Sequence, residues 1–288
     1  MSLPLLIGIA VLLLAIVAYL IGCGGGGAAS SASVSLNSAR SVQLAKAPGV
    51  DPDDYRWKDI ANNLYAAAFV GSFDYSTPTV TVNFDDSSDT LQGTIDATGL
   101  KPNFAYQIKL IGKPTGDWGA AGDDAANERI GYAGRWWSDV SGNQDDAYYQ
   151  AHHGTETIVG YLVTGFLITD EDGQASVNWR VENSYHVLWN TGQRAANADD
   201  RPSQAHTLAF SSWGYSLPYP AVSTQTIYPE QEPTRSTSGN ARLAAGSYHC
   251  IFALYEESFH DVADGAGPGG NWAKAMQYAD LDFDVLAP

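Results

Sequence analysis

The stretch TLQGTIDATGLKPNFAYQIKLIG, residues 90–112, decides the fold. Over residues 90–97, apolar or small residues alternate with polar ones, the period of two that places one set of side chains on a core face and the other in water. The alternation returns over residues 104–111, where Phe104, Tyr106, Ile108 and Leu110 share one face and Ala105, Gln107, Lys109 and Ile111 the other. Gly99 and Pro102 mark a turn between them. The stretch therefore predicts two β-strands joined by a turn.

Within this stretch, residues 100–106 have the form L-x-P-x-x-x-Y, which resembles the corner between strands E and F of fibronectin type III and related immunoglobulin-like sandwiches. The resemblance implies that Leu100 closes the bottom of the sandwich and that Pro102 sets the turn. It also implies that the Tyr106 hydroxyl hydrogen-bonds back to the corner backbone. What it implies is a fold and no activity, because this fold hosts many unrelated functions.

Further strand patterns lie on both sides of this stretch. They cover residues 79–84, 161–169, 174–181, 246–255 and 279–285. Residues 246–255 are apolar on both faces and predict a central strand. Short strands are also expected at 207–210 and 222–227. The strand at 79–84 is expected to form a three-stranded meander with the opening pair, and the acidic turn 170–173 to close a hairpin. A short helix is expected over 59–68. Strand signals outnumber helix signals, so we predict an all-β domain over residues 55–288, an immunoglobulin-like antiparallel β-sandwich.

The N-terminal segment, residues 1–22, is hydrophobic. Residues 3–21 are almost wholly apolar and long enough as a helix to cross a bilayer. Residues 20–23 (LIGC) resemble the lipobox of bacterial lipoprotein signal peptides, which implies cleavage before Cys23 and lipid attachment at this cysteine. The alternative is an uncleaved transmembrane anchor. Residues 23–54, rich in Gly, Ala and Ser, predict a flexible linker in either case.

Two long segments, residues 113–157 and about 190–239, show no sustained period and are rich in aromatic residues. Loops of this length are usually functional or disordered, and so many aromatic residues favour order. We expect ordered loop insertions whose rings either bind a protein or a sugar, or form a secondary core beneath the insertions. The candidate binding aromatics are Trp118, Trp136, Trp137, Trp213, Tyr215 and Tyr219.

The last predicted strand carries Asp280, Asp282 and Asp284 on one face, about 7 Å apart from each to the next, while Leu281, Phe283 and Val285 are expected to face the core. Three like charges in a row require compensation. Basic residues on a neighbouring strand, solvent, or a Ca²⁺ ion would each supply it. Asp261 and Asp264, in the nearby loop, add carboxylates of the same type, so the five aspartates form a candidate Ca²⁺ site.

Composition narrows the function classes. Fifteen Lys plus Arg against 32 Asp plus Glu give a net charge of −17, which argues against nucleic-acid binding. The sequence contains no nucleophile elbow, phosphate-binding loop or dinucleotide fingerprint. We therefore expect a non-catalytic, membrane-tethered protein of the cell envelope. Its extracytoplasmic domain would bind a protein partner or self-assemble. The alternatives are a glycan-binding surface lipoprotein and a secreted hydrolase that uses Asp or Glu.

Overall fold

A computed structural model describes residues 39–48, 73–190, 204–208, 223–231, 241–257 and 274–288. These residues are mostly β-structure, and nearly all strand pairs are antiparallel. The strands are β1 Ala39–Gln43, β2 Ala45–Lys46, β3 Thr79–Asp85, β4 Ser87–Ser88, β5 Gln92–Thr98, β6 Ala105–Ile111, β7 Arg135–Ser138, β8 Gly142–Gln144, β9 Ile158–Ile168, β10 Ala175–Arg180, β11 Tyr185–Asn190, β12 Gln204–Leu208, β13 Ser223–Gln231, β14 Gly246–Glu257 and β15 Lys274–Val285. The helices are α2 Thr115–Trp118, η2 Gly119–Ala121, α3 Asp124–Ala133 and α4 Asp146–His152.

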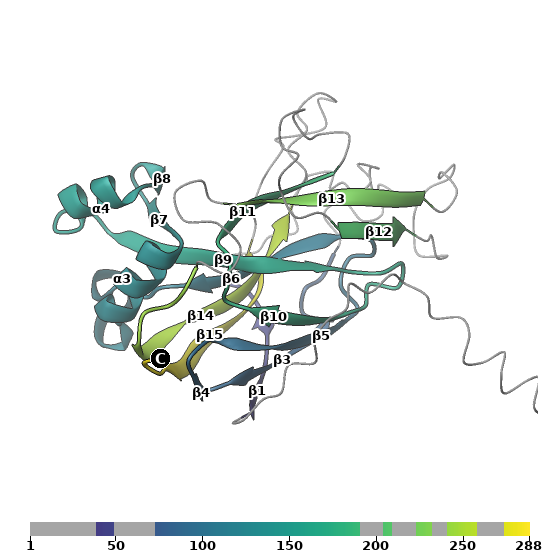
Figure 1. Cartoon of the computed structure of the whole chain (residues 1–288), viewed down its shortest axis with the longest axis horizontal. Helices are drawn as coiled ribbons and strands as arrows, with labels where there is room; N and C mark the ends of the chain where they lie inside the picture. The colour runs from purple at the N-terminus through teal and green to yellow at the C-terminus, as the bar shows by residue number, and fades with distance from the viewer. Residues whose placement is uncertain (1–38, 49–72, 191–203, 209–222, 232–240, 258–273) are drawn as a thin grey trace, which may run out of the picture. The chain divides into compact units, whose positions relative to one another are not determined.

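Within the described part of the chain, the strands form two sheets. The smaller sheet has four strands in the order β1-β3-β5-β10. The larger sheet has eleven strands, and its main path runs β12-β13-β11-β9-β6-β14-β15-β2. Figure 1 shows β3, β5 and β10 below the long strands β6, β9 and β14, with α3, α4 and the β7–β8 hairpin gathered at one end. None of the described helices is long and apolar enough to span a membrane.

The opening stretch forms the two expected strands, but they do not pair with each other. β5 pairs with β3 and β10 in the smaller sheet, whereas β6 pairs with β9 and β14 in the larger one. The predicted three-stranded meander is therefore wrong, and the chain crosses between the sheets after β5. The predicted hairpin at residues 170–173 is wrong for the same reason, because β9 and β10 also belong to different sheets.

The two segments in which the chain crosses between the sheets, one after β5 and one after β9, run side by side and are joined by backbone hydrogen bonds. Leu100 N–H donates to the carbonyl of Gly173 at 3.0 Å, and Asn103 N–H donates to the carbonyl of Asp170 at 2.9 Å. Gly173 has a φ of 72°, and a Cβ there would lie 2.0 Å from the Leu100 carbonyl oxygen. A glycine is therefore required at this position both by the backbone conformation and by the close approach of the two chains.

One hydrophobic core lies between the two sheets. Its buried cluster joins Val80, Val82 and Ile95 of the smaller sheet to Leu110, Phe252 and Phe283 of the larger one. The predicted alternation over residues 90–97 is confirmed, since Leu91, Ile95 and Ala97 are buried. So is the central position of β14, which is hydrogen-bonded on one side to β6 and on the other to β15.

The first predicted insertion, residues 113–157, is not an irregular loop. It contains all four described helices and the β7–β8 hairpin, which continues the larger sheet through β9. Asn127, on α3, fixes the insertion to β9: its Nδ2 donates to the carbonyl of Ile158 at 3.0 Å, and its Oδ1 accepts from the N–H of Gly160 at 2.7 Å. A Cβ at Gly160 would lie 2.4 Å from the Asn127 carbonyl oxygen, so a glycine lets α3 lie directly on the strand.

The remaining segments change the predicted boundaries. Residues 39–46, part of the predicted linker 23–54, form β1 and β2, which pair with β3 and β15. β12 and β13 lie where the second insertion was expected to contain short strands. The rest of the N-terminal region and the helix predicted over 59–68 lie outside the described residues.

Candidate functional site

The corner residues of the opening stretch form a buried polar cluster. The Tyr106 hydroxyl accepts a hydrogen bond from the Lys101 N–H at 3.1 Å and lies 3.2 Å from the hydroxyl of Tyr75. Lys101 Nζ lies 2.6 Å from Glu256 Oε1, and Tyr75 also donates to this carboxylate. Leu100 and Pro102 are buried beside them. Burial, with the nearby Glu256 charge second, raises the pKa of both tyrosines, which keeps them protonated.

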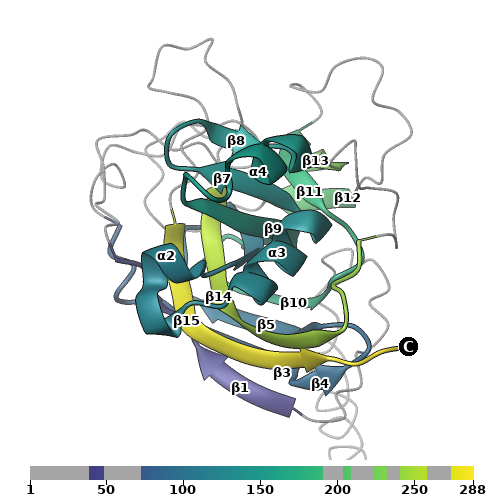
Figure 2. The same ribbon diagram turned by 90° about the vertical axis from the view of Figure 1, so that its left-hand side faces the viewer.

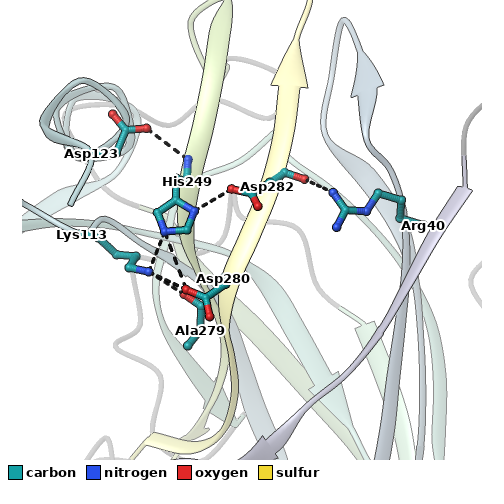
Figure 3. Close-up of polar contacts among 7 residues, drawn as sticks. All are labelled: Arg40, Lys113, Asp123, His249, Ala279, Asp280 and Asp282. Atoms are coloured by element: carbon teal, nitrogen blue, oxygen red, sulfur yellow. Dashed lines mark hydrogen bonds and ion pairs between the residues drawn. The ribbon is translucent and has the colours of Figure 1, made fainter. Parts of the chain in front are cut away.

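The acidic face of β15 is compensated mainly by neighbouring basic groups. As predicted, Leu281, Phe283 and Val285 are buried, and Asp280 and Asp282 are 67% and 58% exposed on the opposite face. Lys113 Nζ, itself buried, lies 2.9 Å from Asp280 Oδ1, and its hydrogen bond is the main cause of a lowered Asp280 pKa. His249 Nδ1 lies 2.6 Å from Asp282 Oδ1 (Figure 3).

These contacts fix the tautomer of His249. Lys113 Nζ is 2.8 Å from His249 Nε2, and a lysine ammonium can only donate, so Nε2 accepts and the ring proton is on Nδ1. That proton is donated to Asp282. Lys113 Nζ also donates to the Ala279 carbonyl at 3.1 Å and lies 5.3 Å from the Trp118 ring. The cluster therefore uses its charges internally and supports Trp118 of α2.

The candidate Ca²⁺ site is not assembled by the part of the chain described here. No group of three His, Cys, Asp or Glu side chains among these residues converges in a way that would hold a metal ion. Asp284 lies on the same face of β15, and Asp261 and Asp264 lie outside the described residues. Ca²⁺ binding stays a prediction. Cys23 also lies outside them, whereas Cys250 is a buried free thiol.

The candidate aromatic residues separate into two groups. Trp136 is fully buried and stacks on Tyr149, with ring centroids 3.6 Å apart and planes 6° apart. It belongs to a secondary core beneath the insertion. Trp118 and Trp137 are 38% and 48% exposed and belong to the lining of one groove. The other candidates, Trp213, Tyr215 and Tyr219, lie outside the described residues.

The groove lies on the face of the larger sheet that is turned away from the smaller one, and has a volume of about 600 Å³. Its walls come from α2, β7, β9 and β14, which contribute four aromatic rings: Trp118, Trp137, Tyr161 and Tyr255. Figure 2 shows these elements around the long strands, with α2 on one side and β7 on the other. Pockets of this size and aromatic content are typical of sites for small ligands.

Lys109 is the buried basic residue of the groove. It lies on the central strand β6, directly opposite Ala253 of β14. Tyr255 and Tyr161 stand to either side of the lysine. Its Nζ lies 4.1 Å from the centroid of the Tyr255 ring and 4.9 Å from that of Tyr161. The faces of the two rings stabilise a cation at this position.

Lys109 is the most perturbed group of the groove. Its side chain is only 9% exposed. Its pKa is lowered from 10.5 to about 7, and burial is the main cause. The charges of Arg135 and Lys274 also lower the pKa, whereas the Glu257 charge raises it. A large fraction of this amine is therefore uncharged at neutral pH.

The other buried lysines differ from Lys109 in having carboxylate partners. Lys101 pairs with Glu256 and Lys113 with Asp280. Glu257, the carboxylate whose charge raises the Lys109 pKa, accepts hydrogen bonds from Gln107 Nε2 and from the Leu188 N–H. Among the described residues, Lys109 Nζ has no hydrogen bond or ion pair, only the two tyrosine rings.

The alternation of the opening stretch predicted that Lys109 faces away from the core, toward water. The face is right, but the exposure is wrong: all seven residues of β6 are buried. The insertion packs over this face of the sheet, so Gln107 and Lys109 are enclosed. One sequence signal for this buried lysine was available. It is a lysine between apolar residues of a central strand, followed by an aromatic-rich insertion.

A second hollow, of about 380 Å³, lies beside α3 and α4, and Glu128 and Glu156 are among its lining residues. Both carboxylates are engaged in hydrogen bonds. Glu128 accepts from the Tyr149 hydroxyl at 2.9 Å, and Glu156 accepts from Ser138 Oγ at 2.8 Å and from the Tyr148 hydroxyl. These bonds lower the pKa of Glu156, which keeps it ionised and does not suit a general acid.

Comparison of the chain with protein-family models, with curated proteins and with solved structures finds no match.

Proposed function

We propose that the chain is a binding protein displayed at the cell envelope, and that it recognises a glycan in the groove over Lys109. The observation that carries this proposal is the groove itself: a concave site of about 600 Å³ with four aromatic rings and one buried amine. Tryptophan and tyrosine rings offer flat apolar platforms with polar edges, which suit the faces of sugar rings.

The groove favours a glycan over the protein partner that the sequence analysis placed first. The described large hydrophobic residues with high exposure are few, and Trp118 and Trp137 line the concave groove. Protein interfaces of standard size are broader, and bury about 800 Å² on each partner. Self-assembly through sheet edges is the weaker alternative, and an oligomeric state that persists after dilution would favour it.

The fold and the tether remain part of the proposal. The hydrogen bond from the Lys101 N–H to the Tyr106 hydroxyl and the crossing between the sheets support an immunoglobulin-like sandwich. The LIGC sequence supports a lipoprotein tethered through Cys23, with a transmembrane anchor as the alternative. Intact mass of the protein extracted from its native membrane separates the two, because a chain that retains Met1 excludes cleavage before Cys23.

The glycan proposal is tested by isothermal titration calorimetry with a panel of neutral and acidic oligosaccharides. Replacing Trp137 by alanine removes one wall of the groove, and should weaken binding of the recognised sugar about tenfold or more, roughly 1.4 kcal/mol. Tyr132→Ala is the matched control, because Tyr132 is 41% exposed but does not line the groove. Equal affinity of wild type and Trp137→Ala would contradict the proposal, as would a panel without any binder.

A hydrolase stays the alternative from another class, and its candidate groups are the carboxylates that line the smaller hollow. Glycoside hydrolysis uses two carboxyl groups on either side of the scissile bond. Release of reducing ends from the panel sugars, lost in Glu128→Gln or Glu156→Gln, would establish this activity. Such a result would replace the non-catalytic interpretation, whereas binding without release supports it.

A further inference from the structure

We propose that the glycan bound in the groove is acidic, and that its carboxylate is received by Lys109. The ligand class is a saccharide that contains uronic acid. This inference rests on the proposed function, since it names the chemistry of the ligand for the same groove.

Lys109 differs from the other two buried lysines in its charged partners. A buried charged group is stable when it has a partner of opposite charge or sufficient hydrogen bonds. Lys101 and Lys113 meet this rule through Glu256 and Asp280. Lys109 has neither kind of partner among the described residues, and its side chain is one of those that line the groove. A ligand carboxylate would supply this missing partner and restore the charged form of the amine.

Several charged groups surround Lys109. Arg135 of β7 and Lys274 of β15 both act on Lys109 as like charges, and Lys274 also lines the groove. The Glu257 carboxylate is the opposing charge, and it is held by Gln107 and the Leu188 N–H. His186, on β11, lines the groove and contacts Arg135. In a chain of net charge −17, three basic residues, Lys109, Arg135 and Lys274, lie in or beside one groove.

Lys109 and the two tryptophans lie at different depths in the groove. Lys109 lies deep between the Tyr161 and Tyr255 rings, while Trp118 and Trp137 are more exposed. A sugar ring stacked on a tryptophan can direct its carboxylate inward to the amine. Asp117 is the one carboxylate among the described lining residues, and it lies exposed beside Trp118. It therefore does not occupy the position of the ligand carboxylate.

The experiment compares a matched pair of ligands by calorimetry: tri-galacturonate and the neutral galactotriose. Wild type should bind the acidic trisaccharide at least tenfold more tightly. Lys109→Met should remove this preference and retain the affinity for the neutral sugar. Lys46→Met is the control, because Lys46 is an exposed lysine of β2 that does not line the groove. A third ligand, benzoate, presents a carboxylate on a ring that is not a sugar.

Each outcome has a defined meaning. Loss of the preference in Lys109→Met, with the control unchanged, supports the proposal. Equal affinity for the two trisaccharides, reduced for both by Trp137→Ala, would overturn the acidic ligand and retain glycan binding. Binding of benzoate, but of neither trisaccharide, would overturn the inference that the ligand is a saccharide. No binding of any of the three would overturn this inference, and the wider oligosaccharide panel then decides on the proposed function separately.

Discussion

Lys109 is the residue on which the account of the groove depends, and its environment predicts a pH-dependent stability. Because the folded state lowers its pKa from 10.5 to about 7, the folded chain binds this proton less readily than the unfolded chain. The resulting cost is fully present below pH 7, and disappears as the pH rises toward 10.5. Lys109→Met removes an ionisable group from this environment, so it should stabilise the fold below pH 7, by roughly 2–5 kcal/mol.

Urea unfolding of wild type and Lys109→Met across pH 6 to 10.5 measures this effect. The difference in unfolding free energy between the two should be largest at the acid end and shrink as the pH increases. Lys46→Met should show no such trend. A difference that is independent of pH would mean that Lys109 has an ordinary pKa in the folded protein.

At the same scale, sequence patterns predicted the direction of side chains better than their exposure. Alternation assigned Leu281 and Phe283 to the core and Asp280 and Asp282 to the opposite face, as found. The same rule failed for the exposure of Lys109, because alternation reports the face of a strand and not what covers it. The covering groups come from residues 113–157 and from other strands, which the local pattern does not contain.

At the scale of elements, α3 holds the insertion against the larger sheet, and Asn127 is its main polar attachment. Replacing Asn127 by alanine leaves the carbonyl of Ile158 and the N–H of Gly160 without these bonds, at a cost of roughly 2–4 kcal/mol. Hydrogen–deuterium exchange should then increase in α3 and the start of β9, and remain unchanged in β3 and β5. The control is Asn178→Ala, on the exposed face of β10. Unchanged exchange in α3 would show that the helix is held by other contacts.

Elements were predicted unevenly, for identifiable reasons. Most strands of the core, among them β3, β5, β6 and β14, were predicted because each carries a period of two or a continuous apolar run. β1 was not, and its residues were assigned to the linker. The sheet to which each strand belongs was not predicted. A turn such as residues 99–104 has the same composition whether the chain returns beside itself or crosses to the opposite sheet. α3 was missed because its buried face is made of small residues such as Ala126 and Ala133, with Ile130 as the one large apolar side chain.

At the scale of the whole molecule, the charge distribution links the sequence to the proposed ligand. The chain has a net charge of −17, which argues against nucleic acid as a partner. This charge does not argue against a small acidic ligand, because two basic residues, Lys109 and Lys274, line the groove. The acidic surface then acts mainly on the approach of the ligand, and the buried amine determines its affinity.

Proton uptake on binding of tri-galacturonate tests whether Lys109 receives the ligand carboxylate. It is obtained from binding enthalpies measured in two buffers of different ionisation enthalpy. At pH 8 the free Lys109 is mostly uncharged and the bound carboxylate favours its charged form, so wild type should take up about one proton per ligand. The uptake should fall toward zero at pH 6, and be absent in Lys109→Met. Binding without proton uptake at pH 8, or with the same uptake in Lys109→Met, would contradict the account.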